Sequence, residues 1–421
     1  MFLSIAYALS THRSLVSKRM ILWGLGFQFF LALFVLGVPA WNIRGPLKFF
    51  FEAANVGILK ILLFTEEGTR FLAGDLVDPS RYGFILVVQV LPIIIFISSL
   101  MTVLYHLGIM QWVVNAFAIV MQRLLGISGA ESLAAAANVF VGQTEAPLVI
   151  RPYLKSMTQS ELFSVMVGGM ATIAGSVMAA YVGLLKDSIP GIGGHLLTAS
   201  ILSAPAALVV AKIMIPETGK PETLGHVPNN KKSEHVNVIE AAANGASDGM
   251  KLAINVAAML LAFIALIAMV DAMFITFGDW IGFSQWGRSF TPEFLMAEHG
   301  AQFSLALILS WLFTPVAFFL GIPFSDLEIA GALIGKKIVF NEFIAYLDLA
   351  KLAKDLSPRS AIILSYALCG FANFSSIAIQ IGGIGPLIPA RKSELARLGI
   401  RSIIGGSLAA FITACVAGLL I

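Results

Sequence analysis

Long apolar segments constrain this chain more than any other feature of its sequence, because a helix that crosses a bilayer needs about 20 apolar residues. Such segments lie at 21–41, 83–105, 161–185, 196–215, 250–276, 360–381 and 400–421. Two more apolar segments, 107–122 and 303–321, are predicted either to span the membrane or to lie in its interface. The first segment, MFLSIAYAL, reaches polar Ser10 too soon to span.

Charged residues are scarce along the whole chain. They make up 12% of the 421 residues, whereas hydrophobic residues make up 58% and the mean hydropathy is +0.89. Soluble domains usually carry about 25% charged residues. The sequence therefore predicts an all-α polytopic membrane protein. No basic stretch interleaved with aromatic residues suggests a nucleic acid as a partner.

Basic residues predict the orientation of the chain. They share one side if 107–122 and 303–321 do not span and if the segments around Glu145 and Glu342 are re-entrant. The positive-inside rule makes that side cytoplasmic, together with the turn-rich linker 216–240. The residues concerned are Arg13, Lys18, Arg19, Arg151, Lys155, Lys212, Lys220, Lys231, Lys232, Arg391, Lys392, Arg397 and Arg401.

Two acidic residues interrupt segments that are otherwise largely apolar. Glu145 follows the lead-in LLGISGAESLAAAA at 124–137, and Glu342 follows the similar FLGIPFSDLEIAGA at 319–332. A charged side chain at the centre of a membrane helix costs about 2.5–3.5 kcal/mol on insertion scales, so each is a candidate functional residue. Two of them in related contexts predict a binding site built from two repeats.

The internal similarity extends beyond the acidic residues. GMATIAGS at 169–176 resembles GFANFSSI at 370–377, so the repeats run over about 107–215 and 303–421. An odd number of predicted spans lies between equivalent points, which makes the repeats inverted. Gly, Ser, Thr and Asn in these two short segments predict broken helices, and broken backbone at membrane depth is tolerated where protein or a cavity satisfies it. The alternative is close helix packing through small residues.

The motif GQTEAP places polar groups at a predicted hairpin tip. Gly142 permits a tight turn, and Pro147 suits the first turn of a helix. Between them Gln143, Thr144 and Glu145 offer an amide, a hydroxyl and a carboxylate, which can hydrogen-bond the polar edge of a ring. The alternative is an interfacial loop that caps a helix.

The counterpart in the second repeat is the pair Asn341–Glu342. Its carboxylate can accept from two hydroxyls at once, which suits a sugar diol. The alternative is an ion pair to Lys336 or Lys337. The broken segment that follows adds further donors and acceptors, and its aromatic residue can pack on a planar ligand face or simply in the core: Phe371, Asn373, Ser375 and Ser376.

Other function classes lack sequence support. No Walker A, kinase, hydrolase or HExxH motif is present, so we expect energy from an ion gradient rather than from ATP. An integral-membrane enzyme could use the two carboxylates as acid and base, but the chain has no recognisable nucleophile, metal set or cofactor motif. Two inverted hairpins favour alternating access over a channel.

Three motifs together resemble the concentrative nucleoside transporter family in its bacterial form. They are GQTEAPLVIRPYL at 142–154, NEFIAY at 341–346 and CGFANFSSIAIQIGGIG at 369–385. The resemblance covers essentially the whole chain. It implies a homotrimer in the bacterial inner membrane, with about eight transmembrane helices, two re-entrant hairpins and interfacial helices per protomer.

The family pattern also implies a division of labour within the chain. A scaffold would comprise 1–106 and 216–302, the latter including the linker and the sixth helix. A transport part, 107–215 and 303–421, would carry the substrate by an elevator motion. The first helix is about half the length that the family leads us to expect, and it belongs to the scaffold.

Residue by residue, the resemblance implies a nucleoside site and a sodium site. The polar base contacts fall on Gln143, Thr144 and Glu145, the ribose contacts on Glu342, Asn373 and Ser376, and the apolar contacts on Val177, Leu252 and Phe371. The sodium site falls on Asn138, Val141, Thr144, Thr172 and Ile173. Nucleosides such as uridine and the coupling ion Na⁺ are the expected ligands, with no other cofactor. The alternative is proton coupling, in which Glu145 or Glu342 titrates.

Overall fold

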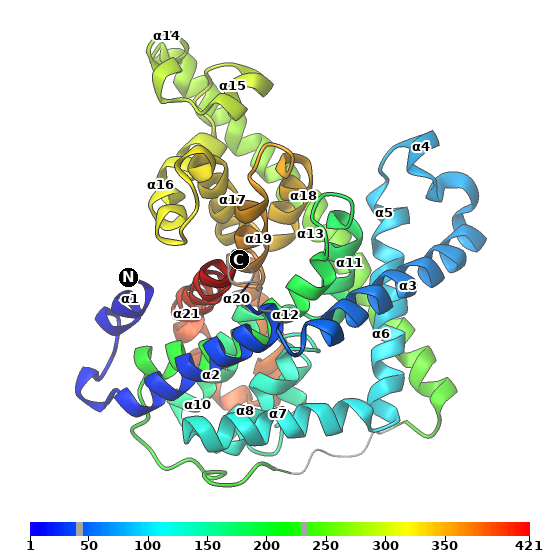
Figure 1. The fold of residues 1–421 in the computed structure, drawn as a ribbon, viewed down its shortest axis with the longest axis vertical. Helices are drawn as coiled ribbons and strands as arrows, with labels where there is room; N and C mark the ends of the chain where they lie inside the picture. The colour runs from blue at the N-terminus through cyan, green and yellow to red at the C-terminus, as the bar shows by residue number, and fades with distance from the viewer. Residues whose placement is uncertain (39–44, 229–234) are drawn as a thin grey trace.

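The computed structural model describes residues 1–38, 45–228 and 235–421. Within these ranges the regular elements are α-helices and short 3₁₀ helices, and the β-type pairing is an isolated bridge between Ser128 and Leu224 (Figure 1). The predicted all-α fold is confirmed.

Six helical stretches in the described residues are long and apolar enough to cross a membrane. They are Lys18–Leu36, Leu86–His106, Gln159–Leu185, Ile192–Met214, Val238–Trp280 and Pro389–Leu420. Each overlaps a predicted span. The remaining predicted span, 360–381, is divided between two short helices, because its backbone leaves the helical conformation between Ala367 and Phe374.

In its described residues, the N-terminal part contains three long helices, α2 (Lys18–Leu36), α3 (Lys48–Ala73) and α6 (Leu91–His106), that precede the first repeat. Its other α-helices are α1 (Phe2–Ala8), α4 (Pro79–Tyr82) and α5 (Leu86–Gln89). Helix α3 is not among the predicted apolar segments, because charged side chains recur along it. Two of its ion pairs join residues one turn apart, Lys48 to Glu52 at 4.0 Å and Arg70 to Glu66 at 2.9 Å.

The two repeats have the same order of elements. The first comprises α7 (Ile109–Leu125), α8 (Gly129–Asn138), α9 (Ala146–Val149), α10 (Gln159–Ala171), α11 (Gly175–Leu185) and α12 (Ile192–Met214). The second comprises α16 (Leu305–Phe319), α17 (Leu327–Val339), α18 (Glu342–Leu352), α19 (Pro358–Ala367), α20 (Phe374–Ile384) and α21 (Lys392–Leu420). In each repeat a helical hairpin is followed by a broken helix and a long one. Helix α7 runs across the direction of α6 rather than along it (Figure 1).

Helix α13 (Val238–Trp280) joins the repeats through 43 residues, a length of about 65 Å. It begins inside the predicted linker 216–240, so the linker boundary at 240 is wrong. Gly245 and Gly249 let α13 approach α6 closely: a Cβ at Gly245 would lie 2.8 Å from the Ser98 carbonyl oxygen, and one at Gly249 would lie 2.8 Å from Ile95 Cα. Small residues four apart are a common way to pack membrane helices. Helices α14 (Phe283–Trp286) and α15 (Glu293–His299) follow.

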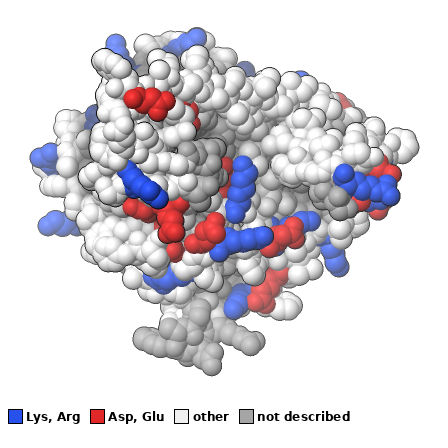
Figure 2. All heavy atoms as spheres, turned by 90° about the horizontal axis from the view of Figure 1, so that it is seen from above, with Lys and Arg blue, Asp and Glu red and all other residues white. Residues whose placement is uncertain are grey.

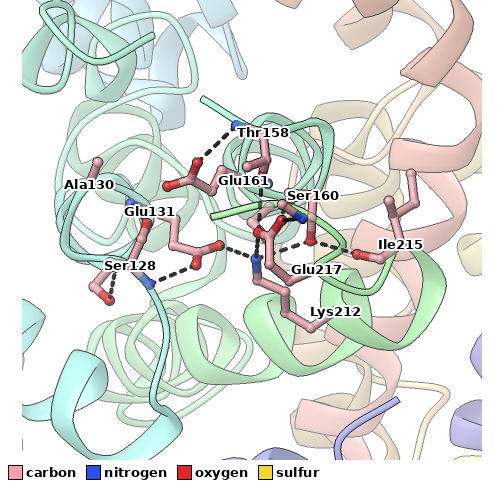
Figure 3. A network of polar contacts seen from close by, with 12 residues as sticks. Ser128, Ala130, Glu131, Thr158, Ser160, Glu161, Lys212, Ile215 and Glu217 are labelled. Atoms are coloured by element: carbon pink, nitrogen blue, oxygen red, sulfur yellow. Dashed lines mark hydrogen bonds and ion pairs between the residues drawn. The ribbon is translucent and has the colours of Figure 1, made fainter. Parts of the chain in front are cut away.

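A buried lysine ties three helices of the first repeat to the linker (Figure 3). Lys212, near the end of α12, places its Nζ 2.9 Å from a carboxylate oxygen of Glu131 on α8 and 3.1 Å from Glu217 in the linker. The same ammonium donates to Ser160 Oγ on α10 at 3.0 Å. Lys212 and Glu131 are both almost completely buried.

The described part of the linker packs against the start of the hairpin. Ser128 and Glu131 form a capping box at the start of α8, and the linker completes this helix end. Gly129 N donates to the Thr223 carbonyl at 2.9 Å, and Ala130 N donates to the Thr223 hydroxyl at 3.0 Å. The linker is therefore part of the folded first repeat.

Uncharged residues cover most of the face shown in Figure 2. Acidic and basic side chains on that face lie intermixed instead of forming separate patches (Figure 2). A largely uncharged surface is the one expected of a protein that contacts lipid.

Candidate binding site

A cavity of about 410 Å³ lies where the two hairpins, the two broken helices and α13 meet. All nine residues predicted to contact the substrate line it: Gln143, Thr144, Glu145, Val177, Leu252, Glu342, Phe371, Asn373 and Ser376. A cavity of this volume is within the usual range for small-molecule sites. Their roles as substrate contacts stay a prediction.

Glu342 is held at the tip of the second hairpin by a polar network. Its Oε1 accepts from the Tyr181 hydroxyl at 2.7 Å, and its Oε2 accepts from Asn373 Nδ2 at 2.9 Å. The local sequence explains the position, because Asn341 caps α18 by accepting from Ile344 N at 2.9 Å. Glu342 then lies in the first turn, where a negative charge is stabilised by the helix N-terminus.

The two lysines that offered an alternative partner for Glu342 do not form an ion pair with it. Lys336 pairs with Asp348 at 2.6 Å, and Lys337 Nζ has no hydrogen-bond partner among the described residues. The alternative interpretation of Glu342 as half of an ion pair with Lys336 or Lys337 is therefore wrong. The Glu342 side chain is buried from the surface and lines the cavity.

Asn373 and Gln143 extend the network to the other repeat. Asn373 Oδ1 caps α20 by accepting from Ser376 N at 3.0 Å and from the Ser375 hydroxyl at 2.7 Å. Gln143 Nε2 donates to Ser376 Oγ at 3.1 Å. Gln143 Oε1 is buried without a partner among the described residues. Acceptors and donors from both repeats therefore meet at the cavity.

Glu145 stands at the tip of the first hairpin and accepts from Gly142 N at 3.0 Å. It borders a second cavity of about 290 Å³ as well, which α6, α11 and α13 help to line. Tyr105 and Asp248 lie on that second cavity. Glu145 thus borders both cavities.

The two broken helices lie against each other at their interruptions. Phe371 N donates to the Thr172 carbonyl at 3.3 Å, which joins the two breaks directly. Gly370 adopts φ of +139°, a conformation that favours glycine, and a Cβ there would lie 2.8 Å from the Met170 carbonyl oxygen. Any larger residue would push the breaks apart. The predicted interruptions at 169–176 and 370–377 therefore coincide with real ends of helices.

Of the five predicted sodium ligands, all except Thr144 lie at the junction of the first hairpin and the first break. Gly175 N donates to the Phe140 carbonyl at 2.9 Å, so the hairpin tip contacts the start of α11. Asn138 ends α8 against Gly168 of α10, and the Thr172 hydroxyl donates to the Gly168 carbonyl at 2.9 Å. Val141 is half-buried, Ile173 is fully buried and Thr144 lines the larger cavity.

Asn138 is 1% exposed, and neither atom of its side-chain amide has a partner among the described residues. A buried amide without a partner costs about 1–3 kcal/mol. Its oxygen is a suitable ligand for a hard cation. The residues present therefore fit Na⁺, which Asn138 and the hydroxyl of Thr172 would hold.

Sequence reasoning missed two polar residues of the cavity, Tyr181 and Asn255. Tyr181 lies four residues after Val177 on α11, so both face the same way. Asn255 lies three residues after Leu252 on α13. Two signals could have found these residues. Both lie at helical spacing from a predicted residue, and Asn255 is also an isolated amide in an apolar helix.

Comparison with known proteins matches the whole chain. Models described as Na⁺ dependent nucleoside transporter N-terminus and C-terminus match residues 1–76 and 195–418, and a model described as nucleoside recognition matches 87–188. The chain belongs to the Na⁺-dependent nucleoside transporter family. The resemblance to concentrative nucleoside transporters is thereby confirmed, and the protein is a multi-pass membrane transporter, not an enzyme.

Relatives of this nucleoside transporter cover its full length. An uncharacterized transporter of Haemophilus influenzae is 44% identical over 429 residues, covering 100% of this chain and 95% of that protein. The nucleoside permease NupC of Helicobacter pylori is 40% identical over 427 residues, covering 99% and 95%. The structure of CNTnw in an inward-facing substrate-bound state is 41% identical, with a TM-score of 0.87 and coverage of 100% and 95%. A variant of CNTnw has also been solved in an outward-facing state.

Proposed function

We propose that this transporter imports nucleosides such as uridine across the bacterial inner membrane, driven by a sodium gradient. The observation that carries the proposal is the cavity in which Glu342, Asn373 and Ser376 meet Gln143 of the opposite repeat. A carboxylate that already accepts from Asn373 still has lone pairs for two ribose hydroxyls. Gln143 Oε1 has no hydrogen-bond donor among the described residues, so it can accept a hydrogen bond from an N–H group of a nucleobase.

Sodium would act through the first hairpin. A cation between Asn138 and Thr172 would hold the hairpin tip against the first break, and the same tip carries Gln143 and Thr144 into the cavity. Ordering that tip would raise nucleoside affinity, and by linkage the nucleoside would raise sodium affinity by the same factor. The orphaned amide of Asn138 supports this site.

Proton coupling is the second candidate. It is favoured by the position of Glu145, which borders both cavities. Its carboxyl group can therefore take up a proton from one cavity and release it into the other. A proton would then replace Na⁺ in driving the transport cycle. The two mechanisms make opposite predictions for uptake without sodium.

The proposed motion is an elevator. The two repeats, 107–215 and 303–421, would move together against a scaffold of 1–106 and 216–302, of which α13 forms one wall of the cavity. The relative CNTnw has both inward-facing and outward-facing structures, which supports a transport cycle of this kind. The family resemblance implies a homotrimer assembled through the scaffold, whose helices α3 and α13 have long exposed faces for lipid or for a neighbouring protomer.

The experiment is uptake of radiolabelled uridine into proteoliposomes that contain the purified protein. It is run under a sodium gradient, under a proton gradient in choline buffer, and with neither. We expect uptake above the level of empty liposomes under the sodium gradient alone. Full uptake in choline under the proton gradient would show that protons, not sodium ions, drive transport. No uptake of any nucleoside would refute the substrate class.

A further inference from the structure

Asn255 is an amide in the wall of the larger cavity, and the proposed nucleoside contacts do not include it. It is the polar residue that α13 contributes to the described lining. The other lining residues of this helix are apolar: Leu252, Val256, Ala258, Met259 and Leu260. A polar side chain in a membrane helix is costly, and it usually marks a partner or a substrate path. The position of Asn255 therefore needs an explanation.

The side chain of Asn255 is available to a ligand. Each of the three other amides that line the cavity already has a hydrogen-bond partner in the protein: Gln143, Asn341 and Asn373. Asn255 makes no side-chain hydrogen bond to another residue that the structure describes, and it is exposed. Its amide oxygen can accept hydrogen bonds and its NH₂ group can donate two. Nucleosides carry both donors and acceptors, so they can satisfy it.

Helix α13 attaches Asn255 to a different part of the protein from the hairpins. Gly245 and Gly249 bring α13 close to α6, and the Ser99 hydroxyl of α6 donates to the Ala242 carbonyl of α13 at 2.8 Å. Helices α6 and α13 both belong to the proposed scaffold. By contrast, the polar residues already proposed to contact the nucleoside all lie in the two repeats: Gln143, Thr144, Glu145, Glu342, Asn373 and Ser376.

We propose that Asn255 hydrogen-bonds the nucleoside from the scaffold and holds it in the conformation that this structure shows. The inference rests on the proposed nucleoside site and on the proposed elevator motion. When the repeats move, the nucleoside travels with the hairpins, whereas Asn255 stays with α13. The hydrogen bond must therefore break before the loaded site moves. It stabilises the bound state but not the transition state of the movement.

Asn255→Ala should weaken binding and speed up the movement of the loaded site. Loss of one neutral hydrogen bond should raise the Kd of uridine about three- to tenfold. The rate of movement should rise by a similar factor, because the variant loses stabilisation of the bound state alone. Calorimetry at constant sodium gives the Kd. Exchange of ³H-uridine for unlabelled uridine across proteoliposomes, with uridine saturating on both sides, gives the rate.

Asn255→Leu is a second variant, with a side chain of similar volume and no hydrogen-bonding group. It should change the Kd and the exchange rate in the same directions as Asn255→Ala. Its melting temperature should be equal to or higher than that of the natural chain, since leucine suits an apolar membrane helix. A residue with a purely structural role would instead lose stability together with affinity.

Two controls separate the scaffold contact from other effects. Ser376→Ala removes a proposed contact that travels with the nucleoside, so it should weaken binding without speeding exchange. Ile254→Ala changes the adjacent residue of α13, which does not line the cavity. It should leave both the Kd and the exchange rate unchanged.

The results have distinct meanings. Weaker binding without faster exchange in the Asn255 variants would show that the contact moves with the nucleoside, and would overturn the proposal. An unchanged Kd in both variants would overturn it as well, because Asn255 would then not touch the nucleoside. No uridine binding to the natural chain would refute the proposed function instead.

Discussion

At the scale of single residues, the cavity is organised by side chains that cap helices and face the ligand space at once. Asn341 and Asn373 each satisfy a helix N-terminus, and those caps fix the adjacent Glu342 and Ser376. The polar lining is therefore rigid before any ligand arrives. Preorganisation of this kind reduces the entropy that binding must offset.

Glu342→Gln should weaken the binding of ribonucleosides by tenfold or more. The amide that replaces Oε1 or Oε2 cannot accept from all of its partners, and an unsatisfied buried group costs roughly 1–3 kcal/mol, more when it is charged. Calorimetry with uridine gives the affinity, and size-exclusion chromatography checks that the variant is folded. An unchanged uridine affinity would remove Glu342 from the ribose site.

Asn138→Leu should abolish the stabilisation of the protein by sodium. Leucine fills a similar volume but offers no oxygen to a cation. A ligand at 100 times its Kd stabilises a protein by about 2.7 kcal/mol, so the natural chain should melt at a higher temperature in sodium than in choline. The variant should melt alike in both salts. Equal sodium stabilisation of both proteins would exclude Asn138 as a ligand.

The sequence predicted the composition of the cavity better than its geometry. The motifs at 142–154, 341–346 and 369–385 contain seven of the nine predicted lining residues, and the family resemblance added Val177 and Leu252. Tyr181 and Asn255 were missed because their roles come from the packing of α11 and α13 around the hairpins, which no local motif encodes. The partners of Lys336 were likewise decided by tertiary structure, since Asp348 lies on the other arm of the hairpin.

At the scale of elements, the hairpins are anchored by polar groups at their starts. The first hairpin is anchored through Lys212, Glu131 and the linker, and the second through Asp326, which precedes α17. Asp326 Oδ2 accepts from Ser357 N at 3.0 Å and from the Ser357 hydroxyl at 2.7 Å, and so joins α17 to the N-terminus of α19. Both anchors leave the hairpin tips to face the cavity.

Lys212→Met should destabilise the protein by about 3–5 kcal/mol, the usual cost of removing one partner of a buried ion pair. Glu131 would be left buried without its cation, next to Glu217. Thermal melting in detergent measures the effect. Lys220→Met, at an exposed position of the linker, is the matched control. Equal melting temperatures for the two variants would show that the buried network contributes no stability.

Asp326→Asn should make stability less sensitive to acid. Burial alone would raise the pKa of Asp326, but hydrogen bonds from Ser360, Ser357 and Ser325 outweigh it and lower the pKa below its ordinary value of 3.8. A lowered pKa in the folded state contributes stability above the ordinary value, and this stability is lost as pH falls through the folded value.

Melting temperature against pH checks this prediction. Between pH 5 and the most acidic pH at which the protein stays in solution, the natural chain should lose more stability than Asp326→Asn. Asp355→Asn, at an exposed position, is the control and should follow the natural chain. Parallel curves for all three proteins would contradict the role of Asp326.

Helices were predictable where one physical signal dominated. Apolar length identified the six long candidate spans, and Gly, Ser, Thr and Asn identified both breaks. Helix α3 was not predicted, because its charged residues lower its hydropathy. Its ion pairs between residues one turn apart nevertheless support the helix. The start of α13 at Val238 was missed because its cap, Asn237, follows a turn-rich sequence.

At the scale of the whole molecule, the two repeats contribute opposite halves of one site. The acidic residues Glu145 and Glu342 come from different repeats and line the same cavity. A site that is closed by both repeats can be opened to one side of the membrane or the other by moving them together, as the proposed elevator requires.

The most direct test of this account is the coupling ratio, measured as simultaneous uptake of ²²Na⁺ and ³H-uridine into proteoliposomes. We expect one sodium ion per uridine, with uridine uptake that rises with sodium at a Hill coefficient near one and vanishes in choline. Uridine uptake that proceeds at full rate without any sodium entry would contradict it.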